Sequence, residues 1–336
     1  MKKYIILLLT SSLFLLTSCN ADLRELCYDH SHSSDTDYTA VLMLDLKLEL
    51  DVDLPVSVED HTKIIAPDYM KVCFYDPQTG ALRSTEYVKG NGGPLHTAPG
   101  NYVMVAYTFG TEWTQIRGEN TISTLEAFTS DITSSKSTAL AGFFRRADGD
   151  PTELEEPIGP IIYTPDHLLV AREPVVIPVP TQEHQVVTIT SKAATIMETY
   201  AFEVTNITGA EYIKSVEAFV TNQASSNRFG VNVRNDSPAT IYFPVEVDVA
   251  NKSLKTTFNT FGKLPGESHS FLHILITDTG GTEYHVSTDI TEKFTNPDHE
   301  IVIDEPVVIP PPESEGGGIA PTVDPWDEEN VDVPIG

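Results

Sequence analysis

The chain has 336 residues, enough for about two domains. Hydrophobic residues make up 40% of it and charged residues 21%, so the chain can bury a core and is not wholly disordered. Its 49 acidic and 21 basic residues give a net charge of −28. A field of that sign repels phosphate backbones, which excludes nucleic-acid binding.

The first residues have the features of a secretory signal peptide. A basic start at Lys2 and Lys3 precedes an apolar run over residues 4–16, which is shorter than the ~20 residues of a transmembrane helix. The run ends in LTSC, and a leucine, two small residues and a cysteine in that order resemble the lipobox of bacterial lipoproteins. The resemblance implies removal of residues 1–18 and acylation of Cys19. An ordinary cleavage site with an incidental cysteine is the alternative.

Acylation of Cys19 would hold the protein on a membrane that its own acidic surface does not attract. The second mature residue is Asn20, not the aspartate associated with inner-membrane retention of such lipoproteins. We therefore expect a lipid-anchored protein of the outer membrane that faces the cell surface.

Two further cysteines remain, Cys27 in the leader and Cys73 in an expected strand. Export to an oxidising compartment allows a disulfide between them. Alternatively, Cys73 packs as a small hydrophobic residue and Cys27 stays free.

After a polar leader over residues 19–37, the sequence predicts strands. From Leu42 to Leu54 every even position is apolar, and the odd positions from Asp45 to Asp53 are charged, which predicts a half-buried strand with an acidic outer face. Turns containing Pro, Gly and Asn separate the strands that follow. These are expected at residues 70–75, 81–88, 101–109, 168–171 and 175–179, with one short helix allowed within 124–140. Residues 38–182 are therefore expected to form an N-terminal β-sandwich.

Prolines 174, 178 and 180 indicate a boundary near residue 182. Further strands are expected at 186–190, 199–205, 215–220, 240–249, 255–261, 270–278, 283–289 and 299–303. A spacing of roughly ten residues is typical of an antiparallel β-sandwich, which we expect over residues 183–305. Residues 306–336 are rich in Pro, then Gly, then acidic residues, and are expected to be a tail without a core of its own.

Several phrases resemble a known family. Residues 98–105 (APGNYVMV) look like the turn and strand of transthyretin-like sandwich domains in Bacteroides-type fimbrial proteins. Residues 25–32 (ELCYDHSH) and 165–171 (PDHLLVA) resemble an uncharacterised lipoprotein family related to the fimbrillins. Residues 257–262 (TFNTFG) and 281–291 are similar to the second domain of fimbrial anchor subunits. The resemblance implies two tandem all-β, Greek-key, transthyretin-like sandwiches in an anchor or accessory subunit for fimbria assembly and cell adhesion.

The resemblance also implies a mode of assembly. In this family an extended segment of one subunit completes a sheet of the next, so fimbrial subunits are the expected partners, joined by β-strand addition. Polymer-forming members are released from the lipid by proteolysis after an arginine in the leader. Arg24 is the only arginine between Cys19 and the first expected strand, and a cut there would remove almost nothing of the leader. This favours a subunit that keeps its lipid.

The acidic end of the tail holds one of the two tryptophans, Trp326. Val331, Val333 and Ile335 follow at a period of two, so these four residues are candidates for a strand that docks on a partner. Calcium binding by the clustered carboxylates is an alternative, although the glycine-centred loop of an EF-hand is missing. A frayed acidic end is the other alternative.

We expect no enzymatic activity and no cofactor. The sequence has no Gly-x-Ser-x-Gly elbow, no Walker loop and no Gly-x-Gly-x-x-Gly after a strand. Cys27, His30 and His32 are too few ligands for a zinc site, and none is expected. Three more histidines fall in or beside neighbouring expected strands as packing or surface residues: His269, His273 and His285.

The alternative function is that of a glycan-binding surface lipoprotein in a polysaccharide-uptake system. Such a protein needs an exposed aromatic platform, for which Trp113 and Tyr107 are the nearest candidates.

Overall fold

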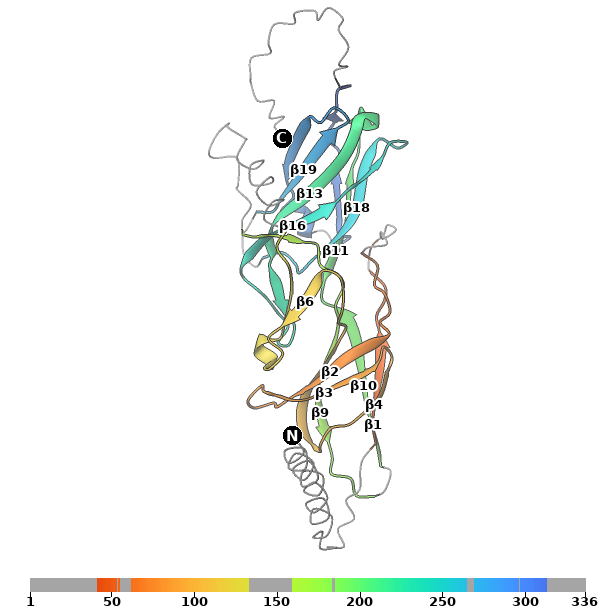
Figure 1. The fold of residues 1–336 in the computed structure, drawn as a ribbon, viewed down its shortest axis with the longest axis vertical. Helices are drawn as coiled ribbons and strands as arrows, with labels where there is room; N and C mark the ends of the chain where they lie inside the picture. The colour runs from red at the N-terminus through yellow and green to blue at the C-terminus, as the bar shows by residue number, and fades with distance from the viewer. Residues whose placement is uncertain are drawn as a thin grey trace, which may run out of the picture. The chain divides into compact units, whose positions relative to one another are not determined.

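The computed structural model describes residues 41–52, 54, 62–132, 159–182, 185–264, 269–295 and 297–312. These residues form β-strands joined by loops, with three single-turn 3-10 helices among them (Figure 1). The all-β prediction is confirmed. In the part of the chain that is described, no helix has both the length and the apolar character needed to cross a membrane.

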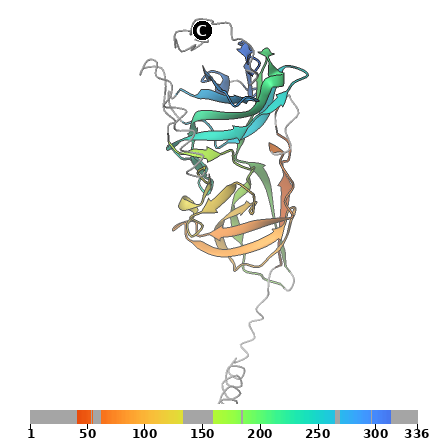
Figure 2. The same ribbon diagram turned by 45° about the horizontal axis from the view of Figure 1, so that its top comes forward.

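The N-terminal strands close into a barrel of order β1-β10-β9-β5-β2-β3-β4. Within it β1 pairs with β10 in parallel, whereas all other pairs are antiparallel. The curved strands β2 and β3 lie side by side in the turned view (Figure 2). The bounds are β1 Val41–Leu48, β2 Tyr69–Tyr75, β3 Leu82–Lys89, β4 Gly92–Leu95, β5 Gly100–Tyr107, β9 Leu169–Ile177 and β10 Val186–Thr195.

Strand β1 confirms the alternating pattern, although it ends at Leu48 rather than at Leu54. Leu42, Leu44 and Leu46 are buried in the barrel core, and Asp45 on the opposite face is exposed. Apolar residues at every second position thus select which face of the strand is buried.

Two barrel strands differ from the expectations. The Gly- and Pro-rich stretch after Lys89 is expected to be a turn, yet it contains β4, which pairs with β1. Gly92 has a φ of 102°, and a Cβ there would clash with the main-chain carbonyl of Leu44, so only glycine fits. Strand β10 starts beyond the expected boundary near residue 182 and completes the barrel, so its pairing assigns it to the N-terminal strands.

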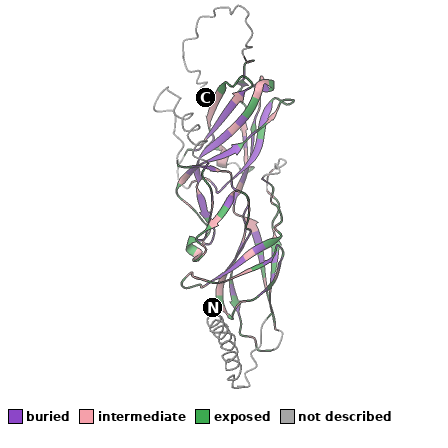
Figure 3. Ribbon diagram, in the orientation of Figure 1, coloured by how far each residue is buried: buried purple, intermediate pink, exposed green. Residues whose placement is uncertain are grey.

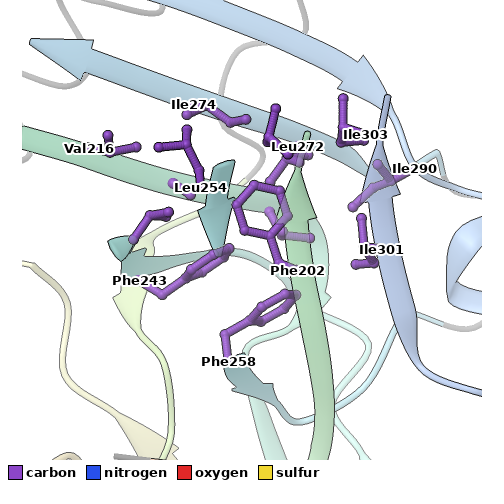
Figure 4. Packing of buried hydrophobic residues seen from close by; sticks show 14 of the residues in the cluster. Phe202, Val216, Phe243, Leu254, Phe258, Leu272, Ile274, Ile290, Ile301 and Ile303 are labelled. Carbon is purple, nitrogen blue, oxygen red and sulfur yellow. The ribbon is translucent and has the colours of Figure 1, made fainter. Parts of the chain in front are cut away.

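The C-terminal strands form two sheets, of order β20-β19-β13-β16-β8 and β17-β18-β11-β21. Side chains from both sheets share one core, seen as buried stretches in Figure 3 and in close-up in Figure 4. Within that core Phe243 and Phe258 stack with ring centroids 4.2 Å apart. The bounds are β8 Ile161–Tyr163, β11 Glu198–Val204, β13 Ile213–Ala224, β16 Pro238–Pro244, β17 Glu246–Asp248, β18 Ser253–Thr260, β19 Phe271–Asp278, β20 Glu283–Asp289 and β21 Glu300–Ile303.

A further sheet, of order β15-β14-β7-β6, joins early and late parts of the chain. Its bounds are β6 Thr114–Arg117, β7 Glu126–Thr129, β14 Ser226–Arg228 and β15 Val233–Arg234. In the described part of residues 124–140, where one short helix is allowed, the chain forms β7 after the 3-10 helix Ile122–Thr124. A third apolar cluster, which includes Tyr107, Leu125 and Phe229, packs residues of the barrel against this sheet.

The tail is expected to begin at residue 306, but the first residues of that range belong to the folded part of the chain. Val307–Val308 form β22, which pairs in parallel with β12, Ile207–Thr208. Val307 and Ile309 are buried in the core of the C-terminal sheets, and the Ile309 amide donates to the Thr208 carbonyl at 2.8 Å. The sequence does not predict β22, because prolines flank the segment and its burial depends on pairing with the distant strand β12.

Candidate interaction sites

Most of the predicted site residues lie outside the described residues. Cys73 is described: it is fully buried, and its sulfur lies 3.7 Å from both Tyr107 Oη and Thr85 Oγ1. A bridge to Cys27 stays a prediction. The sites outside the described part are Cys19, Cys27, His30, His32, Trp326, Val331, Val333 and Ile335.

Strand β1, which directly follows the leader, closes the barrel. It is in register with β10 over its whole length, from Val41 opposite Val186 to Leu48 opposite Ala193, and with β4 over four residues. Its buried leucines fill the barrel core together with side chains of the other barrel strands. A barrel without this strand would hold an apolar groove between two unpaired strand edges, which is the arrangement that β-strand addition requires.

No arginine lies between Arg24 and Arg83. Strand β1 and its connection to β2 therefore contain no site for proteolysis after an arginine. Arg83 itself lies in β3, where its guanidinium pairs with the Asp76 carboxylate at 2.6 Å. Cleavage after Arg24 would thus leave β1 joined to the rest of the barrel.

Two of the phrases that resemble fimbrial proteins, residues 165–171 and 257–262, meet in the structure. The Asn259 side-chain amide donates to the Pro165 carbonyl at 2.9 Å, and its Oδ1 accepts a hydrogen bond from Thr199 at 2.7 Å. All three groups are buried or half-buried. These phrases therefore form a structural joint between segments, and their polar residues are hydrogen-bonded within the fold.

His167 belongs to the same joint. Its Nε2 lies 2.8 Å from the Thr62 carbonyl, and its Nδ1 lies 2.8 Å from Thr195 Oγ1. Because a carbonyl only accepts, Nε2 carries the proton and Nδ1 accepts from the threonine hydroxyl. Burial lowers the pKa of His167, which keeps the ring neutral in this position.

Trp113 and Tyr107 do not form an exposed platform. Tyr107 is fully buried, where its hydroxyl donates to Glu119 at 2.6 Å and its ring meets Phe229 edge-to-face. Trp113 is half-buried, and its ring stacks on Tyr163 with centroids 4.2 Å apart.

Two of the three histidines expected in or beside neighbouring C-terminal strands, His273 and His285, contact each other. His273 Nδ1 lies 3.1 Å from His285 Nε2 across β19 and β20, and His269 bonds to Asp289 at 3.0 Å. Burial and the neighbouring His285 lower the pKa of His273 to about 3. Among the described residues, no group of three or more His, Cys, Asp or Glu side chains could hold a metal ion.

The sequence analysis missed three exposed aromatic side chains, Tyr69, Tyr87 and Phe109. A signal was present: Tyr69 and Tyr87 each alternate with apolar residues that face the barrel core, Met70 and Val88. In a half-buried strand, the alternate positions face solvent. Aromatic rings at such positions are candidates for a binding surface.

Comparisons with known proteins agree with the resemblance found in the sequence. The family described as "Domain of unknown function (DUF5119)" matches residues 18–244. A Bacteroides ovatus protein named as a fimbrium anchoring subunit, Fim4B, is 23% identical over 306 residues, which cover 80% of this chain and 85% of that protein.

One solved structure shows the same fold, and a second is more distantly similar. The crystal structure of a Bacteroides ovatus protein described as an adhesin has a TM-score of 0.54 at 22% identity, covering 82% of this chain and 94% of its own. The fimbrial anchor protein Mfa2 from Porphyromonas gingivalis has a TM-score of 0.43 at 16% identity, covering 78% and 88% of the two chains.

Proposed function

This chain belongs to the DUF5119 family, and we propose that it is an anchor or accessory subunit in fimbria assembly and cell adhesion. In this proposal it is an outer-membrane lipoprotein held at the cell surface by the acylated Cys19. The name of its Bacteroides ovatus relative, a fimbrium anchoring subunit, supports the proposal.

The observation that carries the anchor role is the pairing of β1 with a barrel strand on each side. A stalk subunit released from its lipid must be cut in the leader, and the only arginine there is Arg24, close to Cys19. The barrel then keeps β1, paired on both sides, with its leucines in the core. A barrel already filled by its own strand is not an acceptor for a partner strand, so this subunit would contribute a strand instead.

The tail is the proposed donor. The chain leaves the C-terminal core after Ile309, and Val331, Val333 and Ile335 have the alternation of a strand with one apolar face. The preceding segment already pairs as a short strand, β22 with β12. We propose that Trp326 and the three alternating apolar residues dock in the groove of the next fimbrial subunit by β-strand addition.

In-cell photo-crosslinking tests this function. A photoreactive residue at Val331 is expected to crosslink to fimbrial subunits and give a ladder in surface-sheared material. A matched probe at Val176, which is exposed on β9, is expected to give none. A deletion variant should remove residues 313–336 only, because Val307 and Ile309 belong to the core. Normal fimbriae in that variant, together with no crosslinks from residue 331, would contradict the proposed donor strand.

The membrane anchor is tested separately. Cys19→Ser removes the acylation site, so any chain of this variant that has lost residues 1–18 is expected in the medium, whereas Arg24→Lys is expected to leave the protein in the membrane fraction. Cys19→Ser protein that has lost residues 1–18 and still stays in the membrane fraction would contradict lipid anchoring.

A further inference from the structure

The outer face of the barrel carries an aromatic patch. Tyr69 is 56%, Tyr87 58% and Phe109 44% exposed, and the rings of Tyr87 and Phe109 touch edge-to-face with centroids 5.4 Å apart. Tyr69 lies opposite Lys89 and Lys71 opposite Tyr87 across β2 and β3. Directly opposite residues share a face, so these four side chains lie together, with the two tyrosines as diagonal neighbours.

Fixed polar groups border these rings. Lys71 Nζ lies 2.7 Å from both carboxylate oxygens of Glu119, which also accepts a hydrogen bond from the buried Tyr107 hydroxyl at 2.6 Å. Burial opposes the charge on both groups, but the hydrogen bond between them raises the pKa of Lys71 and lowers that of Glu119. The Glu119 side chain is 36% exposed. The Lys71 side chain is only 15% exposed, so the pair presents mainly the Glu119 carboxylate, and a small part of Lys71, to solvent in a fixed geometry.

The placement of the rings favours ligand binding. Tyr69 and Tyr87 project from paired strands and not from loops, and Tyr87 is also held by its contact with Phe109. Little side-chain freedom is then lost when a ligand stacks on them. Three rings and their polar border are much smaller than the ~800 Å² that each partner contributes to a stable protein interface. A small ligand therefore fits this surface better than a protein partner.

The charge of the patch indicates the chemistry of that ligand. Lys71 and Glu119 neutralise each other and the exposed Lys89 adds one positive charge, but the chain as a whole carries a net charge of −28, which disfavours anionic ligands. Apolar ring faces beside a fixed donor and acceptor match a pyranose, which has an apolar C–H face and a rim of hydroxyl groups.

We infer that the aromatic face, defined as Tyr69, Lys71, Tyr87, Lys89, Phe109 and Glu119, binds a pyranose unit of a neutral glycan. The sugar stacks on the ring of Tyr87, whose orientation is fixed by its edge-to-face contact with Phe109, and its hydroxyls bond to the Lys71–Glu119 pair. This inference is independent of the anchor role and places glycan binding on different rings from Trp113 and Tyr107.

The test uses an array of immobilised neutral oligosaccharides of hexoses and N-acetylhexosamines, with acidic oligosaccharides alongside, probed with the full mature chain. We expect binding to neutral glycans that weakens at least tenfold in Tyr87→Ala and in Phe109→Ala. Tyr87→Phe keeps the ring and is expected to bind within about twofold of the original chain. Val176→Ala, an exposed position on β9, is the matched surface control. Thermal unfolding of each variant establishes that the fold is retained.

Three outcomes would overturn the inference: no binding to any neutral glycan on the array, binding to acidic glycans alone, or binding that Tyr87→Ala leaves unchanged. A photoreactive residue at Tyr87 that crosslinks to a fimbrial subunit would also overturn it, because the face would then be a protein interface. Fimbria formation is expected to be normal in Tyr87→Ala, so failure here is distinguishable from failure of the anchor role.

Discussion

The side-chain amide of Asn259 donates a hydrogen bond to the main-chain carbonyl of Pro165, 94 positions earlier in the chain, at 2.9 Å. Asn259 lies at the end of β18, and Pro165 lies between β8 and β9, so one buried amide ties a C-terminal sheet to the segment that enters the barrel. A buried carbonyl that loses its donor must remain without a hydrogen bond.

We therefore expect Asn259→Ala to lower the free energy of unfolding by about 1–3 kcal/mol, because it removes the donor to Pro165 and one hydrogen-bond acceptor of Thr199. Urea unfolding measures the change. Asn251→Ala is the matched control: Asn251 is exposed in the turn before β18 and is expected to cost less than about 1 kcal/mol. An equal decrease in the free energy of unfolding in the two variants would show that the buried hydrogen bonds of Asn259 do not stabilise the fold.

His273 makes stability depend on pH. Burial and His285 lower its folded-state pKa to about 3, below the ~6.5 of the unfolded chain. As pH falls below ~6.5 the unfolded state binds the proton first, so the stabilisation is complete above that pH and is lost progressively toward pH 3. Between pH 6.5 and 5.5 the free energy of unfolding falls in the original chain. We expect this fall to be smaller by about 1 kcal/mol in His273→Leu, which has no imidazole at this position.

Urea unfolding at both pH values checks this, with His269→Gln as the control, since the His269 side chain is 64% exposed. If His273→Leu and the original chain lose stability in parallel, the neutral buried imidazole is not the source of the pH dependence.

Gly92 holds β4 against β1. Replacement by alanine would set a Cβ against the Leu44 carbonyl and strain a backbone at φ 102°, and we expect a loss of about 3 kcal/mol or more. Gly110→Ala is the control, because Gly110 has a φ of 73° with nothing within 4 Å of its Cβ position. Gly110→Ala is expected to lower the free energy of unfolding by only about 1–2 kcal/mol, the cost of placing alanine in a left-handed backbone conformation. Equal losses would mean that the close approach to β1 is unimportant.

Truncation separates the core from the tail. Removal of residues 313–336 is expected to leave the unfolding free energy unchanged within about 0.5 kcal/mol. Removal of residues 307–336 also takes away the buried Val307 and Ile309, each contributing about 1.5–3 kcal/mol, so the shorter chain is expected to lose several kcal/mol. Denaturant unfolding of both truncated chains makes the comparison. A large loss on removal of 313–336 alone would contradict it.

The sequence predicts the strands more reliably than their partners. β1 is evident because its leucines alternate with charged residues, and that pattern is local. β4 is not evident, because glycine and proline normally indicate turns, and only its contact with β1 explains Gly92. The pairing of β10 with β1 joins segments on opposite sides of the expected boundary, and no local signal encodes such a register.

The same limit applies to the candidate sites. Tyr69 and Tyr87 could be placed on solvent-facing positions from alternation alone. Their position as diagonal neighbours requires the register of β2 and β3, and the contact of Tyr87 with Phe109 requires the course of the chain after β5. For Tyr107 the sequence suggests an exposed ring, but the ring is buried. Phe229, which lies in a loop far along the chain, covers it.

The parallel pairing of β1 and β10 has a mechanical consequence. A pull that enters through the leader acts at Val41, the first residue of β1, and a pull from the C-terminal strands acts at Thr195, the last residue of β10. In a parallel pair these are opposite ends, so tension slides the two strands along each other. Their eight facing pairs then bear the load together and do not open one after another. Such a joint resists tension far better than a hairpin that is peeled from one end.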